Sequence, residues 1–456
     1  MSEKIKLSLT MKVVIGMLLG IIVGLTINLM ELNNVGSYTH TYIIEGLFLV
    51  IGKMFISALK MLVVPLVFFS LICGVCGIGD IKTLGRVGSK SFALYILTTA
   101  IAITLGITLA STVGIGTGMG LESTADFISK TAPPLSQVLI NIIPTNPIKT
   151  MAEGDMLPLI FFSILTGISL IMVGRKAEGF IEGIEVANEV MMKMVMIVMS
   201  VAPYAVFALI AKSMAELGLD LLNQLAAYVL VLTSSLLIHL FIVLMIVLKL
   251  FSGLSPRLFL KKIRSAQVFA FSTASSNATI PITLRTVTER MGVNNSVASF
   301  TVPFGATINM DGTAIMQGVA TVFIANIYGI ELGFVGYLTV ILMSVLASIG
   351  TAGVPGVGLI MLSMVFTQVG LPVEGIGLIL GVDRLMDMIR TVVNVSGDAV
   401  VSTIIAKSEG KLDLATYNNV TDDAQTDNTH LSIDKGVEQE IADVVQQTHD
   451  KEDTLR

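Results

Sequence analysis

Residues 381–407 read GVDRLMDMIRTVVNVSGDAVVSTIIAK, an apolar run of helix length that is interrupted by polar side chains. The interrupting residues are Asp383, Asp387, Arg390, Thr391, Asn394 and Asp398. At about 100° per residue they fall within an arc of roughly 100°, so they share one face of a helix. In a membrane, an ionised residue at the centre of a helix costs at least about 2.5 kcal/mol. This face must therefore contact protein, water or a ligand, and it is the first candidate site.

The composition places that helix in a membrane. The chain has 456 residues, of which 54% are apolar and only 13% are charged, whereas soluble domains carry about 25% charged residues. Apolar stretches of about 20 residues, long enough to span the hydrocarbon core, recur at 13–30, 92–110 and 228–248. The two cysteines, Cys73 and Cys76, have no nearby His and cannot complete a zinc site. We expect an all-α membrane protein that crosses the bilayer many times.

Basic residues indicate how the chain is threaded, because Lys and Arg collect on the cytoplasmic side of membrane helices. The loop at 31–40 contains neither. An N-terminus in the cytoplasm followed by six spans accounts for the basic clusters, which are Lys4/Lys6/Lys12, Lys82/Arg86/Lys90, Arg175/Lys176, Arg257/Lys261/Lys262/Arg264 and Lys407/Lys411. The approximate spans are 11–30, 42–74, 88–121, 137–175, 182–216 and 222–252.

Two later apolar segments, 269–285 and 346–362, are interrupted by small, polar and helix-breaking residues. Unpaired backbone groups at membrane depth are tolerated only inside protein or beside water. We therefore predict two re-entrant helical hairpins. Each precedes a span with polar residues, at 309–313 and 387–398. If the hairpins enter from opposite sides, the two units are inverted repeats, an arrangement that places substrate and ion sites near the midplane.

The polar face has the chemistry of an amino-acid site. Arg390 offers a planar fork for a carboxylate, and Asp387, one turn away, can accept from an ammonium group. Asn394 can donate to a second carboxylate, so aspartate or glutamate fits the spacing. Because Asp311, Asp387 and Asp398 outnumber Arg390, cations should accompany the substrate. Sodium on hard oxygen ligands and protons on buried carboxylates both remain open at this point.

Five motifs carry a resemblance to a known family. They are 275–279 (SSNAT), 309–313 (NMDGT), 350–356 (GTAGVPG), 387–391 (DMIRT) and 394–398 (NVSGD). Along roughly its first 410 residues the chain resembles the glutamate and aspartate transporters of the sodium:dicarboxylate symporter family, especially the prokaryotic sodium-coupled aspartate carriers. The resemblance implies eight transmembrane helices plus two re-entrant hairpins, arranged as a static scaffold and an elevator-type transport domain. It also implies a homotrimer in a prokaryotic inner membrane, with both termini cytoplasmic.

The resemblance divides the chain as follows: a cytoplasmic N-terminus (1–10), scaffold helices 1–2 (11–87), transport-domain helix 3 (88–121), scaffold helices 4–5 (122–221), the remaining transport domain (222–409) and an acidic tail (410–456). The tail holds eleven acidic and four basic residues, and such a segment is expected to be solvated or disordered. The expected partners are an acidic amino acid, co-transported Na⁺ ions and membrane lipid. No organic cofactor, nucleic acid partner or enzymatic activity is expected.

The resemblance also assigns site residues. The implied substrate site comprises Ser275, Ser276, Thr313, Val354, Gly358, Asp387, Arg390, Thr391 and Asn394, with Asp387 on the amino group and Arg390 on the side-chain carboxylate. One implied sodium position involves Gly305, Asn309, Asn394 and Asp398. A second involves Thr307, Ser348, Ile349 and Thr351. A third involves Tyr95, Thr98, Thr99, Asn309 and Asp311.

The chain departs from the family pattern at the first hairpin tip and in the last helix. Asn277 stands where the third tip serine is usual. Members often carry an extra arginine at the positions of Ala274 or Met388, and here Arg384, at the edge of the polar face, is a candidate substitute.

Alternative functions are a proton-coupled glutamate or C4-dicarboxylate symporter, and a neutral amino acid or cystine carrier. Residues 77–80 match the Gly-x-Gly-Asp motif of intramembrane proteases, but no Tyr-Asp pair accompanies it. A channel does not need ammonium and carboxylate contacts on adjacent turns. His239, within a span, is interpreted as a hydrogen-bonded packing residue and not as a proton relay.

Overall fold

The computed structural model describes residues 9–76, 81–118, 140, 142–349, 351 and 353–419. Residues 1–8 of the predicted N-terminal segment (1–10), the motif at 77–80, residues 119–139 and the tail from residue 420 lie outside these ranges. Within them the chain is helical, apart from one isolated bridge between Val293 and Leu412. The expected all-α class is confirmed.

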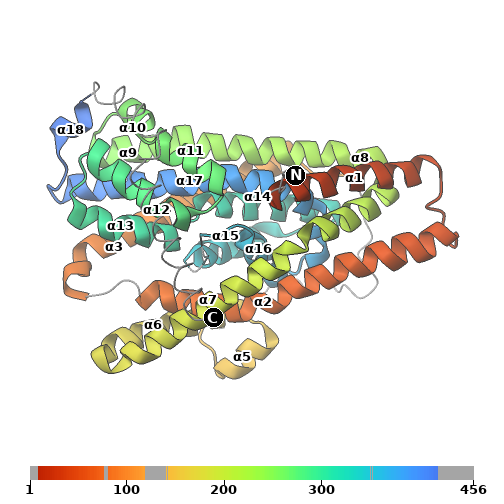
Figure 1. The fold of residues 1–456 in the computed structure, drawn as a ribbon, viewed down its shortest axis with the longest axis horizontal. Coiled ribbons are helices and arrows are strands. Elements are labelled where there is room, and N and C mark those ends of the chain that lie inside the picture. Colours follow the sequence, from red (N-terminus) through yellow and green to blue (C-terminus); the bar gives the residue numbers. More distant parts are fainter. Residues whose placement is uncertain are drawn as a thin grey trace, which may run out of the picture.

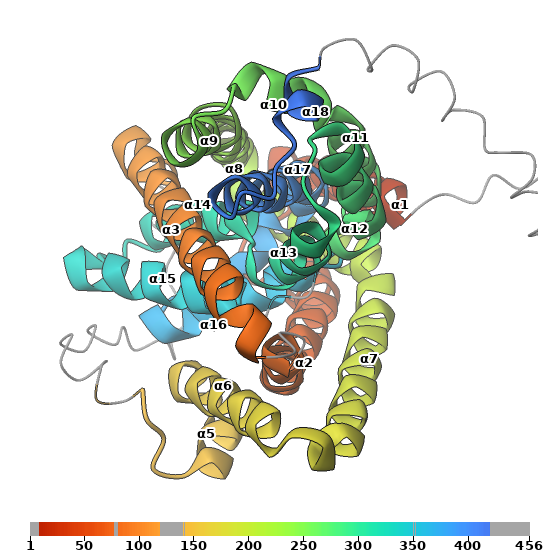
Figure 2. The ribbon, with the colours of Figure 1, turned by 90° about the vertical axis from the view of Figure 1, so that its left-hand side faces the viewer.

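Figures 1 and 2 show how the helices are arranged. In both views α5 and α6 lie at the edge of the molecule opposite α10 and α18. The helices are α1 (Leu9–Leu29), η1 (Thr39–Phe48), α2 (Leu49–Cys76), α3 (Ile81–Val113), α5 (Pro147–Glu153), α6 (Met156–Val173), η2 (Gly174–Ala177), α7 (Glu178–Ser200), α8 (Ala202–Ile238), η3 (His239–Val243), α9 (Leu244–Ser252), α10 (Pro256–Lys262), α11 (Arg264–Thr273), α12 (Ser276–Arg285), η4 (Thr286–Arg290), α13 (Asn295–Ile308), α14 (Asp311–Ile327), α15 (Gly333–Ser348), α16 (Val357–Val369), η5 (Val373–Gly375), α17 (Ile376–Ser408) and α18 (Leu414–Asn418).

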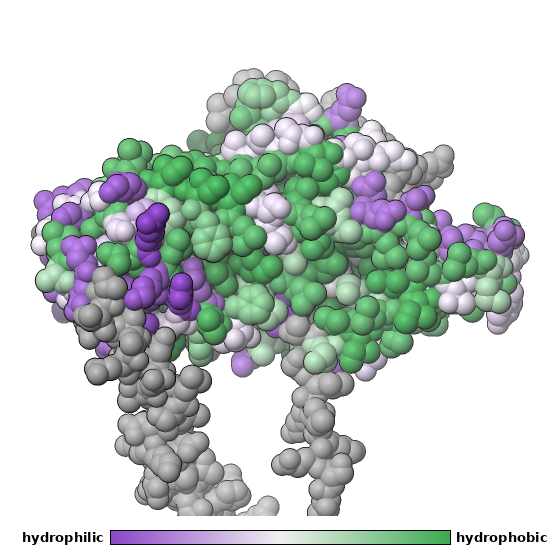
Figure 3. Space-filling model, turned by 90° about the horizontal axis from the view of Figure 1, so that it is seen from above, coloured by the Kyte–Doolittle hydropathy of each residue, from purple (hydrophilic) through white to green (hydrophobic). Residues whose placement is uncertain are grey.

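The surface is that of a membrane protein. Apolar side chains cover the middle of the face shown in Figure 3, and hydrophilic side chains gather toward its two ends. Among the described residues, five helical stretches are long and apolar enough to cross a bilayer: Met11–Leu29, Thr39–Cys76, Arg86–Val113, Pro158–Ser200 and Ala202–Ser252. Charged residues interrupt α17, and α15 and α16 are short. The total of eight crossings therefore stays a prediction.

One predicted span has the wrong limits. The sequence suggested a continuous span at 182–216, but α7 ends at Ser200 and α8 begins at Ala202. Pro203 lies in the first turn of α8, where its missing N–H costs nothing, whereas inside a continuous helix it would remove a hydrogen bond and clash with the preceding turn. The next predicted break is found at Gly218, whose φ of 61° interrupts α8.

Glycines let α1 approach α8 closely. A Cβ atom on Gly16 would lie 2.5 Å from the Pro203 carbonyl oxygen, and one on Gly20 would lie 2.8 Å from that of Phe207. Gly24 meets α8 in the same way at Met214. Small residues spaced by one turn are a common basis for helix packing in membranes, so these two helices form one tightly packed pair.

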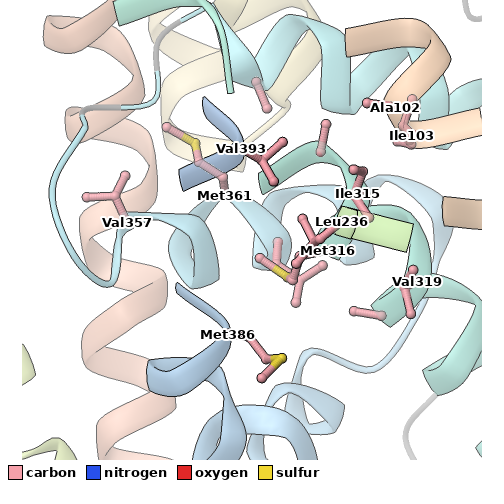
Figure 4. Packing of buried hydrophobic residues seen from close by; sticks show 14 of the residues in the cluster. Ala102, Ile103, Leu236, Ile315, Met316, Val319, Val357, Met361, Met386 and Val393 are labelled. Carbon is pink, nitrogen blue, oxygen red and sulfur yellow. The ribbon is translucent and has the colours of Figure 1, made fainter. Parts of the chain in front are cut away.

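The core that positions the site is built around α14, in which every residue except Asn326 is buried. Figure 4 shows Ile315, Met316 and Val319 of α14 among side chains from α3, α8, α16 and α17, including Ile103 and Leu236. Since α14 has no lipid-facing side, its polar N-terminal residues must face other parts of the protein.

The chain remains ordered beyond α17. The Glu409 carboxylate accepts from Lys90 Nζ at 2.7 Å and pairs with Arg86, both near the start of α3. These contacts, the hydrogen bond from Lys90 first, hold the pKa of Glu409 below its usual range. Tyr417 is fully buried and donates to the Ser255 carbonyl at 3.0 Å. The predicted acidic tail therefore begins with a packed segment that reaches Asn419.

Candidate functional site

The two interrupted segments meet at their tips. In the first, α11 ends at Ala274 with a left-handed φ of 49°, and Ser275 caps α12 by accepting from the Ala278 N–H. The second segment breaks between α15 and α16. Its Gly353 carbonyl accepts from Ser275 Oγ at 2.7 Å and from the Asn277 N–H at 3.1 Å. Ser275 is therefore a capping and joining residue, and it lies behind the cavity described next.

A small cavity of about 20 Å³ lies beside this junction, between the tips, α14 and α17. Its walls include most of the predicted substrate residues. The lining consists of Ala274, Ser276, Met310, Thr313, Thr351, Gly353, Val354, Gly358, Asp387, Thr391 and Asn394. Residues more than a hundred positions apart in the sequence thus converge on one small polar space.

Arg390 does not line this cavity but is bound to Asp387, which does, and its side chain is only 1% exposed. Its Nη1 donates to Asp383 Oδ1 at 2.6 Å and its Nη2 to Asp387 Oδ1 at 2.8 Å. Within the described residues, Arg390 Nε and Asp387 Oδ2 make no hydrogen bond. The guanidinium is thus neutralised by two carboxylates, of which Asp387 lines the cavity. A ligand carboxylate can take the place of Asp387 while Asp383 continues to hold the guanidinium.

The break between α13 and α14 places a second polar group next to the cavity. Asn309 has extended backbone with ψ of 99°, and Met310, with ψ of 51°, is also outside the helical region, so the helical hydrogen bonding stops there. Asn394 Oδ1 accepts from the Gly312 N–H at 2.8 Å, and Asn309 Nδ2 donates to Asp398 Oδ1 at 2.9 Å. These bonds fasten the start of α14 to α17.

Asp311, the first residue of α14, is fully buried and is contacted from two other elements. Thr99 and Thr98 of α3 donate to its Oδ1 at 2.6 and 3.3 Å. His239 Nε2 lies 2.9 Å from its Oδ2. Tyr95 donates its hydroxyl to the Thr301 carbonyl at 2.9 Å and does not bond Asp311.

The same region matches a known family. The model of the sodium:dicarboxylate symporter family matches residues 9–408. The chain belongs to this family. It is 36% identical to the proton/glutamate-aspartate symporter of Escherichia coli (strain K12) over 429 residues, which cover 90% of this chain and 95% of that protein. It is 33% identical to the proton/sodium-glutamate symport protein of Geobacillus stearothermophilus, covering 89% and 96%. The C4-dicarboxylate transport protein of Bacillus subtilis (strain 168) is 31% identical, covering 90% and 95%.

In symporters of this family the coupling cation is transported cargo, and it requires a set of oxygen ligands. No group of three or more His, Cys, Asp or Glu that could hold a metal ion occurs in the described part of the chain. Single carboxylates with amide and hydroxyl oxygens are nevertheless available. Asn309 Oδ1 is buried without a hydrogen-bond partner there, and a Cβ on Gly305 would lie 2.4 Å from Asp398 Oδ1 and 2.6 Å from the Tyr95 hydroxyl. This donor set suits a hard monovalent cation.

The remaining predicted sodium position is less compact. A Cβ on Gly74 would lie 3.1 Å from Thr307 Cγ2 and 3.5 Å from the Ile349 carbonyl oxygen, so these two residues face the same point. The hydroxyls of Thr307, Ser348 and Thr351 each donate to a carbonyl of their own segment. Because these hydroxyl protons are used within the segments, this position offers a cation only oxygen atoms, from backbone carbonyls and hydroxyls.

Sequence reasoning missed two contacts. Asp383 was placed on the polar face but not identified as the second partner of Arg390. His239 was interpreted as a hydrogen-bonded packing residue, with which its contact to Asp311 agrees, but Asp311 was not identified as its partner. Both had a usable signal, because an ionisable residue in an apolar span requires a polar partner.

Gly353 yields a test of the tip junction. It lines both the candidate substrate cavity and a neighbouring cavity of about 270 Å³ that α2 and α13 also line. A Cβ there would lie 2.8 Å from Asn277 Oδ1 and 3.1 Å from the Asn277 nitrogen. Overpacking costs about 1–3 kcal/mol, so we expect Gly353→Ala to lower substrate uptake in liposomes by about tenfold. Gly183→Ala, where no atom lies within 4 Å, is the control; equal uptake by both variants would contradict the junction's role.

Proposed function

We propose that this protein is a secondary active transporter that carries L-aspartate or L-glutamate into the cell together with sodium ions. The main support is the pair formed by buried Arg390 and cavity-lining Asp387. A guanidinium selects a carboxylate, and a carboxylate selects an ammonium group. An acidic amino acid supplies both groups and so separates the pair without leaving either charge unpaired.

The rest of the cavity suits the other end of the substrate. Ser276, Thr313, Thr391 and Asn394 offer hydroxyl and amide groups around a cavity of about 20 Å³. This space holds about one water molecule, so its walls would have to open to admit an amino acid. A second substrate carboxylate would be held by these groups and by the N–H groups at the start of α12 and α16, where helix dipoles favour an anion. Bound sodium ions at Asp311 and Asp398 would offset the buried negative charge.

An elevator mechanism accounts for how the substrate crosses. We propose that residues 11–87 and 122–221 form a scaffold, that 88–121 and 222–409 move as a transport domain, and that three copies assemble. With the N-terminus in the cytoplasm, the start of α1 is at the inner side. Leu9 and Val13 of α1 line a cavity together with Asp387, which supports a substrate site held near the cytoplasmic side in this conformation.

Proton coupling is a second candidate, favoured by one observation in the site. His239 and Asp311 are adjacent and fully buried, and a relative is named a proton/glutamate-aspartate symporter. The same cavity would then carry the substrate, and a proton would replace a sodium ion as the compensating charge.

Uptake by proteoliposomes tests both candidates. L-aspartate, L-glutamate, succinate and serine would each be offered under a sodium gradient and, separately, under a pH gradient without sodium. We expect sodium-driven accumulation of L-aspartate or L-glutamate and none of serine. Uptake of succinate without either amino acid would reject the substrate class. Accumulation driven by the pH gradient alone would reject sodium coupling in favour of protons.

A further inference from the structure

Four charged residues follow one another along two turns of α17. Arg390 binds Oδ1 of Asp383 and Oδ1 of Asp387. The other oxygen of Asp387, Oδ2, lies 3.7 Å from Arg384 Nη1. Asp387 therefore stands between two guanidinium groups, and the cluster as a whole has two positive and two negative charges.

Arg384 and Asp387 also line a second small cavity of about 20 Å³, which Thr391 and Asn394 do not line. The walls of this cavity are mainly apolar and come from α1, α7, α8, α16 and α17; they include Leu9, Val13, Met199, Val206, Leu359 and Leu380. The side chains of Arg384 and Asp387 are 16% and 12% exposed. In such surroundings water screens charges weakly, so the positive charge of Arg384 acts on Asp387 at close range.

We propose that Arg384 is a specificity-determining residue, which weakens Asp387 as an acceptor for the substrate ammonium group. This inference rests on the proposed function. A guanidinium beside Asp387 repels an incoming ammonium and lowers the negative potential that a plain dicarboxylate would meet. Arg384 therefore brings the affinities for acidic amino acids and for C4-dicarboxylates closer together. Arg390, by contrast, would bind the carboxylate that acidic amino acids and C4-dicarboxylates both have.

The test compares two ligands in full-length protein reconstituted in liposomes. The half-saturation of labelled L-aspartate uptake and the inhibition constant of succinate are measured for wild type, Arg384→Gln and Arg384→Lys. We expect the ratio of the succinate constant to the L-aspartate constant to rise at least about tenfold in Arg384→Gln, which corresponds to about 1.4 kcal/mol. Arg384→Lys keeps the charge and should keep the wild-type ratio.

Several outcomes would overturn the assignment. One is a smaller rise in the ratio for Arg384→Gln. Another is a parallel loss of both affinities, as a merely structural residue would give, and a third is failure of the Lys variant to restore the ratio. Arg285→Gln, which removes an exposed arginine on α12, controls for net charge and should leave the ratio unchanged. If wild type itself takes up no L-aspartate, the proposed function fails first, and that result is distinct from an unchanged ratio in an active transporter.

Discussion

Replacement of Arg390 by alanine is expected to abolish sodium-driven uptake of L-aspartate and L-glutamate. The variant removes the guanidinium that would hold the side-chain carboxylate and that binds both Asp383 and Asp387. Loss of one partner of a buried charged pair costs about 2–5 kcal/mol or more, so acidic substrates should bind at least about thirtyfold more weakly. Competition against labelled L-aspartate binding by purified protein measures this loss.

Two further variants separate binding from folding. The double variant Arg390→Ala with Asp383→Asn removes one of the stranded carboxylates, and it should purify in an assembled form even if the single variant does not. We expect it to accept neutral amino acids such as serine, because Asp387 can still hold an ammonium group. Arg390→Lys keeps the charge but not the planar fork, so its affinity should lie in between. Wild-type affinity for L-aspartate in Arg390→Ala would remove Arg390 from the site.

The polar residues of the site could be predicted because ionisable side chains are rare in membrane-spanning helices. Ionisable residues at 383, 387, 390 and 398 in an apolar helix have few explanations other than a shared buried face. Helix breaks at 274 and 309 were visible as small and polar residues within apolar runs, and the structure has a left-handed residue and extended backbone there. The residue types alone were therefore enough to predict the polar face and these helix breaks, and they lie within the residues that match the family.

What the sequence could not supply was the choice among possible partners. Asp383 and Asp387 are both within reach of Arg390 on a helix, and only packing decides that it binds both. The contact between His239 and Asp311 joins residues far apart in the chain, so no periodicity indicates it. The break at Val201 was missed because residues 194–211 form an apolar run without a charged residue, in which Pro203 is the one helix-breaking signal.

Asp311 carries the second large expected effect, because two other helical elements reach its carboxylate. Thr98 and Thr99 reach it from α3, and His239 reaches it from η3. Asp311→Asn keeps the shape and removes the charge. If a sodium ion is held here, its loss should raise the sodium concentration required for half-maximal L-aspartate binding at least about thirtyfold, since a hydrogen-bonded buried charge is worth about 2–5 kcal/mol.

A matched variant tells a lost cation ligand from a disturbed helix contact. Thr99→Val removes the 2.6 Å hydrogen bond to Asp311 while the carboxylate and its charge remain. A site that works through charge predicts a much smaller shift for Thr99→Val than for Asp311→Asn. Equal shifts would mean that packing between α3 and α14 matters and the carboxylate does not. An unchanged sodium requirement in Asp311→Asn, in protein that still binds L-aspartate, would instead favour a cation site near Asp398. Asn309 donates to Asp398, and within the described residues its Oδ1 has no hydrogen-bond partner.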